Sequence, residues 1–291
     1  MGKDSVNSDL VIYHANCVDG FTAAWIVWSA GHANSCEYYP AQYSDKEVDL
    51  PDVIGRNVYM VDFSLKRPQM LDVIKKAASV KVFDHHKTAK AELAGIDGCV
   101  FDITKSGAML AYEFFKPSYV SLDFVKYVQD RDLWQWALYN SKEINAYIQN
   151  QEKTFSRWEA INSLMRNPKS TPTSGGIPYI IDVGKQLLNN TANYIAYMKT
   201  LVQIKRDLQG RRVALVNSSG WNASDLLGEL TEGVDYVVGW FVESTGKIVY
   251  QLRSNGKVDV AEVAKDQGGG GHKNAAGFMS EHNPRIFFLD I

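Results

Sequence analysis

The sequence predicts an α/β protein with an N-terminal parallel-sheet domain, a helical linker and a smaller C-terminal mixed-sheet domain. Two observations predict it. Short apolar runs alternate with helix-like segments up to about residue 115, which is typical of βαβ units with right-handed crossovers. Beyond residue 207 the pattern changes to a strand, a helix and a hairpin. A chain of 291 residues can bury two cores, so we expect a domain at 8–178, a linker helix at 179–206 and a domain at 207–291.

The first domain is expected to contain four strands, at 9–14, 57–63, 79–84 and 98–103. A helix over 20–30 places Phe21, Ala24, Trp25 and Trp28 on one face. Pro68 suits the first turn of a second helix, and a third is expected at 106–115.

From about residue 121 the pattern is helical as far as a loop rich in Pro, Gly, Ser and Thr at 167–178. After the linker helix we expect a strand in RRVALVNS, a helix in ASDLLGEL and a hairpin that turns at STGK. A short helix in DVAEVAKDQ then leads into GGGGHKNAAGF.

Composition indicates a soluble globular protein, with 45% hydrophobic, 22% charged and 12% aromatic residues. The net charge of −2 gives no overall basic field for tight binding to long duplexes. Three cysteines without a CxxC pattern form no disulfide framework, and no apolar run is long enough to span a bilayer. We expect a cytoplasmic protein that does not bind membranes.

Ligand-type side chains stand at the ends of three expected strands. These are His14, Asp62 and the run Asp84-His85-His86, with Asp19 and Asp130 nearby in HANCVDG and VQDRDLW. Taken singly, each has an ordinary explanation as a core histidine, a helix cap or a surface ion pair. Because the carboxyl ends of parallel strands meet at one sheet edge, we expect them to form one site.

Mixed sets of His and Asp suit Mn²⁺, and less exclusively Zn²⁺ or Fe²⁺. Two ions roughly 3.5–4 Å apart need a bridging carboxylate, and together they activate water and neutralise a phosphoryl oxyanion. We therefore expect two Mn²⁺ ions, with Mg²⁺, Zn²⁺ and Fe²⁺ as alternatives.

A second candidate site is the glycine run at 268–271, followed by His272 and Lys273. Consecutive glycines let the backbone approach a ligand and present N–H groups to a phosphate. Arg253 is a candidate fork for a phosphate or carboxylate. The ordinary alternatives are a flexible turn and a surface arginine.

These motifs together resemble the DHH phosphoesterase superfamily with a C-terminal DHHA1 domain. The resemblance is carried by Asp84-His85-His86, by Asp62 in VDFS, by Asp130 in VQDRDLW and by GGGGHKNAAG, and it covers nearly the whole chain. The segment HANCVDG is similar to the branch that begins with His-x-x-Cys-x-Asp-Gly.

The resemblance implies a role for each motif residue. It implies five metal ligands: His14, Asp19, Asp62 as the bridging carboxylate, His85 and Asp130. Asp84 would orient His85, and His86 would face the scissile phosphate. The far end of the substrate would be held by Arg253, Gly269, Gly270, Gly271 and His272. Asn16 and Cys17 stand where many relatives have aspartates, and we expect Cys17 to pack near the ligands without binding metal.

The implied function is that of a hydrolase acting on phosphoric ester bonds, a metal-dependent phosphodiesterase that uses two ions to activate water. Short substrates are favoured because we expect no third domain to track long strands: oligoribonucleotides or other short single-stranded RNA or DNA, dinucleotides, or a nucleoside 3′,5′-bisphosphate. The alternatives are a single-stranded DNA exonuclease, a nucleotide-binding module with weakened catalysis, and an inorganic pyrophosphatase, which fits the glycine run less well. A homodimer is compatible with the sequence.

Overall fold

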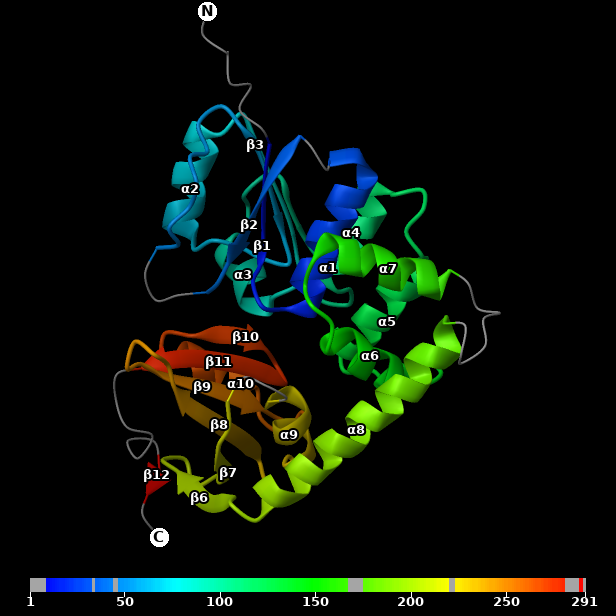
Figure 1. Cartoon of the computed structure of the whole chain (residues 1–291). Helices are drawn as coiled ribbons and strands as arrows, with labels where there is room; N and C mark the ends of the chain where they lie inside the picture. The colour runs from blue at the N-terminus through cyan, green and yellow to red at the C-terminus, as the bar shows by residue number, and fades with distance from the viewer. Residues whose placement is uncertain are drawn as a thin grey trace, which may run out of the picture. The chain divides into compact units, whose positions relative to one another are not determined.

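The computed structural model describes residues 9–32, 35–43, 47–166, 175–219, 223–280 and 288–289. The chain forms two compact units, Met1–Leu188 and Asn189–Ile291, and each unit has its own sheet (Figure 1). Most of the loop expected at 167–178 lies outside the described residues.

The first unit is built on a parallel sheet, as the sequence predicts. Its strands are β1 (Asp9–His14), β2 (Cys36–Ala41), β3 (Asn57–Val61), β4 (Ser79–Asp84) and β5 (Cys99–Phe101). They lie in the order β2-β1-β3-β4-β5, and every neighbouring pair is parallel. The strands β1, β3 and β4 are therefore adjacent, so their carboxyl ends meet at the middle of one sheet edge.

Strand β2 is absent from the sequence-based prediction. It contains Pro40, which has no N–H to donate and normally argues against a strand. Here β2 is an edge strand that pairs with β1 alone among the described strands. A proline is tolerated at a sheet edge, because its missing donor leaves no ladder bond unmade.

Both faces of this sheet are buried, as is usual for parallel sheets. Val11, Val61 and Phe83 face a core that also contains residues of α1 (Val18–Val27), α4 (Gly107–Phe115), α5 (Leu122–Asp132), α6 (Ser141–Gln149) and α7 (Phe155–Met165). Ile12 and Met60 face a second core that includes residues of α2 (Arg67–Lys76) and the residue after α3 (Lys87–Glu92). Helix α2 and the pair α1 and α4 accordingly lie on opposite sides of the sheet (Figure 1).

Helix α1 is buried on all sides, although the sequence predicts only one apolar face. All ten of its residues are buried, and the hydroxyl of Thr22 accepts a hydrogen bond of 2.9 Å from the indole N–H of Trp158. The chain continues into a π-helical turn at Trp28–His32, where Gly31 adopts a φ of 101°. The start of α1, which carries Asp19, is thus fixed by packing on every side.

The helix expected at 179–206 is shorter than predicted. Helix α8 runs from Ile177 to Lys199, and Gln203–Asp207 form strand β6. The segment VQIK alternates apolar and polar residues, which is strand periodicity at the position where the sequence predicts the end of the helix. The buried carboxylate of Asp207 accepts hydrogen bonds from Arg211 Nε (2.6 Å) and Tyr236 Oη (3.0 Å), which fixes the end of this strand.

The second unit contains the predicted mixed sheet. After β6 come β7 (Arg212–Asn217), β8 (Tyr236–Val242), β9 (Ile248–Arg253), β10 (Gly270–His272), β11 (Ala275–Ser280) and β12 (Phe288–Leu289). The order is β10-β11-β9-β8-β7-β6-β12, and among these pairs only β7 and β8 are parallel. The hairpin β8–β9 turns at the predicted STGK, and α9 (Ala223–Glu229) and α10 (Val260–Lys265) pack into separate cores.

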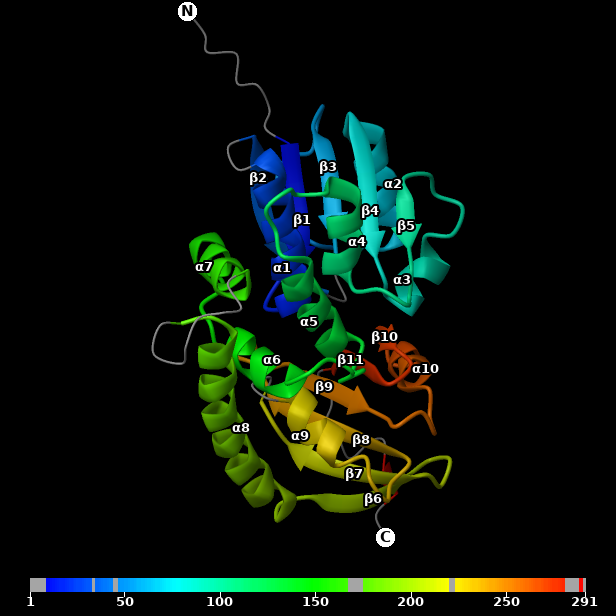
Figure 2. The ribbon, with the colours of Figure 1, turned by 90° about the vertical axis from the view of Figure 1, so that its right-hand side faces the viewer.

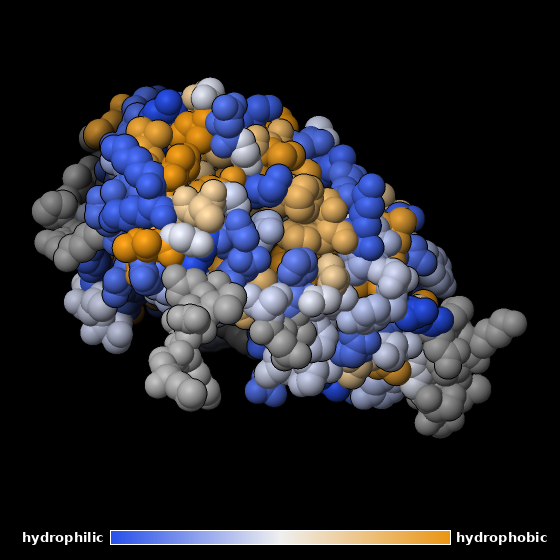
Figure 3. Space-filling model, turned by 90° about the horizontal axis from the view of Figure 1, so that it is seen from above, coloured by the Kyte–Doolittle hydropathy of each residue, from blue (hydrophilic) through white to orange (hydrophobic). Residues whose placement is uncertain are grey.

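The surface mixes hydrophilic and hydrophobic residues, as the face in Figure 3 shows. Exposed apolar side chains such as Ile54, Val100 and Ile103 belong to separate elements and loops, which is normal for a globular protein. Within the described parts of the chain, no helix combines the length and apolarity needed to cross a membrane.

Candidate metal centre

The structure brings most of the predicted ligand residues to the carboxyl edge of the first sheet. His14 is the last residue of β1, Asp62 follows β3 directly, and His85 follows β4. Asp19 reaches the same place from the first turn of α1. Three segments far apart in sequence therefore supply one cluster, with His14 and Asp19 in the same one.

The imidazole of His85 is the centre of this cluster. Its Nε2 lies 3.1 Å from Asp62 Oδ1, 3.4 Å from Asp132 Oδ2 and 3.9 Å from Asp19 Oδ2. The side chains of His85, Asp62 and Asp19 are at most 2% exposed, whereas that of Asp132 keeps 24% of its surface accessible. Three carboxylates thus converge on one imidazole, and two of them, Asp19 and Asp62, are buried while Asp132 is open to solvent.

Asp19 is fixed by the start of α4. Its Oδ2 accepts the N–H of Gly107 at 2.6 Å, and its Oδ1 accepts the N–H of Ala108 at 3.1 Å. A Cβ on residue 107 would lie 2.4 Å from the Cβ of Asp62, so only glycine lets this helix end approach so closely. The carboxylate therefore caps α4, and does not cap its own helix.

Asp62 lies close to both His14 and His85. It adopts a left-handed φ of 54°, and its Oδ2 lies 3.6 Å from Nδ1 of His14. No donor among the described residues reaches its buried Oδ1 with hydrogen-bond geometry. Burial would raise the pKa of Asp62, but the imidazoles of His14 and His85 outweigh it and hold the pKa well below its usual range.

Asp84 was expected to orient His85, but its side chain orients His86. Its Oδ1 lies 2.6 Å from Nδ1 of His86 and accepts the backbone N–H of both histidines, at 2.7 and 3.2 Å. Its Oδ2 accepts a hydrogen bond from the hydroxyl of Ser64. Burial would raise the pKa of Asp84, but His86 and Ser64 outweigh it and lower the pKa to about 2. Burial opposes a charged His86, and Asp84 outweighs that effect and raises its pKa.

The structure replaces Asp130 by Asp132 in the candidate ligand set. Both carboxylate oxygens of the buried Asp130 accept backbone N–H groups, from Ala137 at 2.9 Å and from Leu138 at 3.4 Å. Asp132, the last residue of α5, faces His85 instead. The two aspartates lie in the same motif, DRD, and residues two apart point in different directions from a helix, about 200° around its axis. The motif alone does not show which of them faces the sheet edge.

Cys17 lies in this neighbourhood as well. Its sulfur belongs to a group with ligand atoms of His14 and Asp62 that all lie within 4.8 Å of one another. Burial, together with the carboxylates of Asp62 and Asp132, raises the pKa of the Cys17 thiol well above its usual value. That Cys17 supports the ligands without binding metal stays a prediction. Asn16 beside it adopts a left-handed φ of 58°.

The residues at this edge fit a divalent cation. Burial and the neighbouring carboxylates raise the pKa of Asp19 well above its usual range, and burial also raises that of Asp132. Burial opposes a charged His85, but Asp132 and the other two carboxylates outweigh it and raise the pKa to about 11. Like charges in a largely buried site disfavour one another's ionisation. A divalent ion would supply the missing positive charge, and carboxylate and imidazole ligands suit Mn²⁺ or Mg²⁺.

In the second unit, Arg253 and His272 share one face of the sheet. His272 pairs with Ala275, and Ala275 pairs with Arg253, so the three lie in one row across β10, β11 and β9. Directly opposite residues of antiparallel strands project on the same face. The small side chain of Ala275 therefore separates the two basic ones. Arg253 is oriented by hydrogen bonds of 2.8 Å to the hydroxyl of Ser224 and to a backbone carbonyl.

The glycine run leads into an edge strand of the second sheet. Gly269 precedes β10, and Gly270 and Gly271 are its first two residues. Gly271 adopts a φ of 141°, and a Cβ there would lie 2.6 Å from the carbonyl oxygen of Ala275. Close packing against β11 is thus one reason for glycine at this position.

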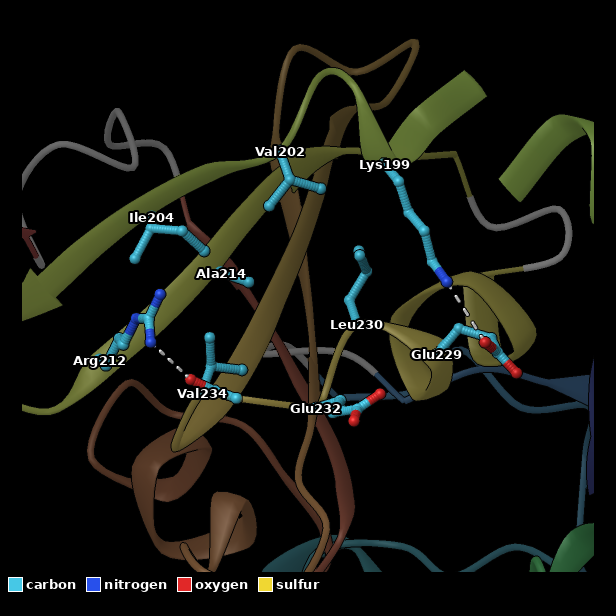
Figure 4. A pocket seen from close by; sticks show the side chains of 10 residues that line it. Lys199, Val202, Ile204, Arg212, Ala214, Glu229, Leu230, Glu232 and Val234 are labelled. Atoms are coloured by element: carbon cyan, nitrogen blue, oxygen red, sulfur yellow. Dashed lines mark hydrogen bonds and ion pairs between the residues drawn. The ribbon is translucent and has the colours of Figure 1, made fainter. Parts of the chain in front are cut away.

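A separate hollow of about 450 Å³ lies beside β6 and β7 in the second unit (Figure 4). Val202 and Ile204 line it, and Lys199 Nζ lies 3.4 Å from Glu229 Oε2 at one side. Neither Arg253 nor any residue of the glycine run lines it. It is therefore distinct from the candidate substrate residues.

Comparison with known proteins agrees with this architecture. The DHHA1 domain model matches residues 213–287. The uncharacterized protein R106 of Acanthamoeba polyphaga mimivirus is 30% identical over 296 residues, covering 94% of this chain and 68% of that protein. The length of this alignment and its identity make R106 a relative along nearly the whole of this chain.

Two solved structures share the fold. RecJ from Thermus thermophilus, in complex with Mn²⁺, aligns with a TM-score of 0.51 at 14% identity and covers 96% of this chain. This chain spans only 50% of that RecJ. The DHH domain of a member of a ribosomal protein family also gives a TM-score of 0.51, at 12% identity, covering 96% of this chain and 84% of that one. The protein therefore belongs to the same family as R106, carries a C-terminal DHHA1 domain, and shares its fold with RecJ and with that DHH domain.

Proposed function

We propose that this protein is a divalent-metal-dependent phosphodiesterase that hydrolyses short single-stranded oligonucleotides or dinucleotides. The observation that carries the proposal is the convergence of Asp19, Asp62 and Asp132 on Nε2 of His85. An excess of carboxylates around a buried imidazole, with Asp19 and Asp62 buried themselves, is costly unless a cation compensates it. The sheet-edge position is also where ligands bind in open α/β folds.

The residues proposed to hold the metal are His14, Asp19, Asp62, His85 and Asp132. Asp62 would bridge two ions, because it contacts His85 and also belongs to the groups formed with His14 and with His86. When bound, the metal polarises a phosphoryl oxygen and lowers the pKa of water. Thermus RecJ, which shares the fold, was crystallised with Mn²⁺, and this supports Mn²⁺ as the first ion to test.

The remaining residues would bind and orient the substrate. Asp84 Oδ1, 2.6 Å from Nδ1 of His86, raises the pKa of His86 and so favours its charged form, which would donate to the phosphate undergoing hydrolysis. Arg253 and His272, on one face of the second sheet, would bind a phosphate or base at the far end of the substrate.

Hydrolysis of di- to decanucleotides of RNA and DNA, with a cyclic dinucleotide and pyrophosphate as controls, tests this proposal. We expect the linear dinucleotides and short oligonucleotides to be cleaved with Mn²⁺, and cleavage to stop in EDTA. The variant Asp62→Asn should be inactive, whereas Asp123→Asn, whose side chain is 70% exposed on α5, should retain wild-type activity.

Each of the other possible results of this assay would indicate a different function or mechanism. Undiminished cleavage in EDTA would rule out the metal mechanism, and cleavage of pyrophosphate alone would indicate a pyrophosphatase. Binding of dinucleotides without cleavage would indicate a nucleotide-binding module, and a strong preference for long single-stranded DNA would indicate an exonuclease.

A further inference from the structure

The loop that joins α5 to α6 presents two tryptophans beside the candidate metal centre. Trp134 is 45% exposed, and its ring centroid lies 5.0 Å from that of Trp136, with an interplanar angle of 72°. Tyr139 in the same loop is 81% exposed. Helices α5 and α6 lie close together in Figure 2, and the loop occupies residues 133–140 between them.

The backbone of this loop is held in an unfavourable conformation. Trp134 and Trp136 have φ values of 56° and 53°, in the left-handed region that bulky residues rarely adopt. Such conformations persist where the surroundings over-determine them, and they cluster at functional sites.

Asp130 supplies that support. Its carboxylate accepts the N–H groups of Ala137 and Leu138, and its carbonyl oxygen accepts the N–H of Gln135 at 2.8 Å. The buried aspartate, predicted as a metal ligand, therefore shapes the segment that presents the tryptophans.

Cationic groups accompany the aromatic pair. The Arg131 guanidinium carbon lies 5.7 Å from the ring centroids of both tryptophans, and Lys142 Nζ lies 5.8 Å from that of Trp136. Proteins that bind single-stranded nucleic acids combine aromatic rings, on which bases stack, with positive charges that attract the phosphates. This loop offers both components on a protein whose net charge is −2.

The loop also lies at the right place. Trp134 is two residues from Asp132, so their Cα atoms are at most about 7 Å apart, since an extended residue spans no more than about 3.6 Å. A nucleobase on Trp134 would leave the phosphate of the same nucleotide close to the candidate metal centre.

We propose that Trp134 is a stacking surface for a nucleobase of the substrate, with Arg131 attracting the adjoining phosphate. The inference rests on the proposed function for the location of the scissile phosphate. It adds that the substrate is recognised through a base on the side of the first unit, so an abasic substrate should bind poorly.

Fluorescence of a dinucleotide that contains 2-aminopurine tests stacking directly, in EDTA so that hydrolysis does not interfere. We expect the full-length wild-type protein to quench the probe on binding. Trp134→Ala should abolish the quenching and weaken binding about 5- to 150-fold, the range expected for the loss of one base–aromatic stack. Trp134→Phe should restore most of both. Phe114→Ala is the matched control, because Phe114 is also 45% exposed and lies under a lysine, but at the far end of α4.

The proposal is overturned if the wild-type protein does not quench the probe at saturating concentrations, or if Trp134→Ala quenches it fully. It is also overturned if a dinucleotide abasic at the probe position binds as tightly as the intact one. Self-association that Trp134→Ala abolishes while quenching persists would show that the loop is a protein-docking surface. Quenching without hydrolysis under Mn²⁺ would reject the proposed function alone, and hydrolysis without quenching would reject the stacking alone.

Discussion

At the scale of single residues, the motif DRD shows how one turn of a helix assigns two neighbouring aspartates to different tasks. Asp132 faces His85 with a distance of 3.4 Å, while Asp130 accepts backbone N–H groups of the following loop. Asp132 is thus placed for a cation, and Asp130 is placed to hold the loop.

Exchanging each aspartate for asparagine should separate these tasks. We expect Asp132→Asn to reduce turnover about 100-fold, because losing a metal ligand removes several kcal/mol of transition-state stabilisation and each 1.36 kcal/mol is tenfold. Its thermal stability without metal should not fall, because its ionised form is disfavoured in the fold, as its raised pKa indicates. Asp130→Asn should lose about 1–3 kcal/mol of unfolding free energy, because hydrogen bonds to a buried charge are weakened.

Calorimetric titration with Mn²⁺ and thermal unfolding of both variants check this, with Asp123→Asn as the surface control. If Asp130→Asn lost Mn²⁺ binding at unchanged stability while Asp132→Asn kept it, the assignment of Asp132 would be wrong.

The sequence identifies the chemical types in the site better than the individual contacts. The sequence predicts that His14, Asp62 and His85 lie together, because strands and helices alternate and the carboxyl ends of parallel strands meet at one sheet edge. The choice between Asp130 and Asp132 depends on how α5 is rotated about its axis, which is set by tertiary packing. Likewise, whether Asp84 orients His85 or His86 depends on a side-chain rotamer in the turn after β4.

At the scale of elements, local patterns failed where tertiary contacts override them. Strand β2 was not predicted because it contains Pro40, and it forms as an edge strand through its pairing with β1. The end of α8 was extended too far because the strand-like segment 203–207 directly follows a long helix. The burial of α1 on every side could not be predicted, because it requires knowing that α5 and α7 pack beside it.

The contact between α4 and β3 depends on one glycine. Gly107→Ala would place a Cβ 2.4 Å from the Cβ of Asp62 and 3.0 Å from Asp19 Oδ2. Alanine gains up to about 1 kcal/mol from reduced freedom of the unfolded chain, but overpacking costs about 1–3 kcal/mol. We expect a net loss of stability and a larger loss of Mn²⁺ affinity, since two candidate ligands must move.

Denaturant unfolding and Mn²⁺ titration of Gly107→Ala measure both effects, with Glu113→Ala at the exposed end of the same helix as control. Wild-type Mn²⁺ affinity in Gly107→Ala would show that the approach of α4 to Asp62 does not position the ligands.

At the scale of the whole molecule, the chain pairs a unit rich in buried carboxylates with a unit that carries the basic row. The two sheets belong to compact units with separate cores, so the stability of one unit should depend little on a ligand that binds the other. A cation bound in the first unit should therefore stabilise that unit selectively.

Mn²⁺ should raise the unfolding temperature of the wild-type protein, and EDTA should reverse the effect. A ligand at 100 times its Kd adds about 2.7 kcal/mol of stability when it binds only the folded state. Differential scanning calorimetry with and without Mn²⁺ measures this, and Asp62→Asn should remove most of the shift. An equal shift in Asp62→Asn would place the bound ion elsewhere.

The basic row of the second unit should act on the substrate and leave the metal untouched. Arg253 and His272 flank the small Ala275 in one row, so a ligand that contacts both must lie over Ala275. We expect Arg253→Ala or His272→Ala to raise KM about 10- to 150-fold, since hydrogen bonds to charged groups contribute about 1.5–3 kcal/mol. Ala275→Leu keeps both basic groups but fills the space between them, and it should raise KM to a similar extent. Arg206→Ala on β6 is the matched control, because its guanidinium donates to the carbonyl of Gly210 in the turn that follows β6, away from that row. Steady-state kinetics measure substrate binding in these variants, and elemental analysis of the folded proteins measures their metal content. A fall in bound Mn²⁺ in Arg253→Ala, His272→Ala or Ala275→Leu would contradict the prediction that this row acts on the substrate alone.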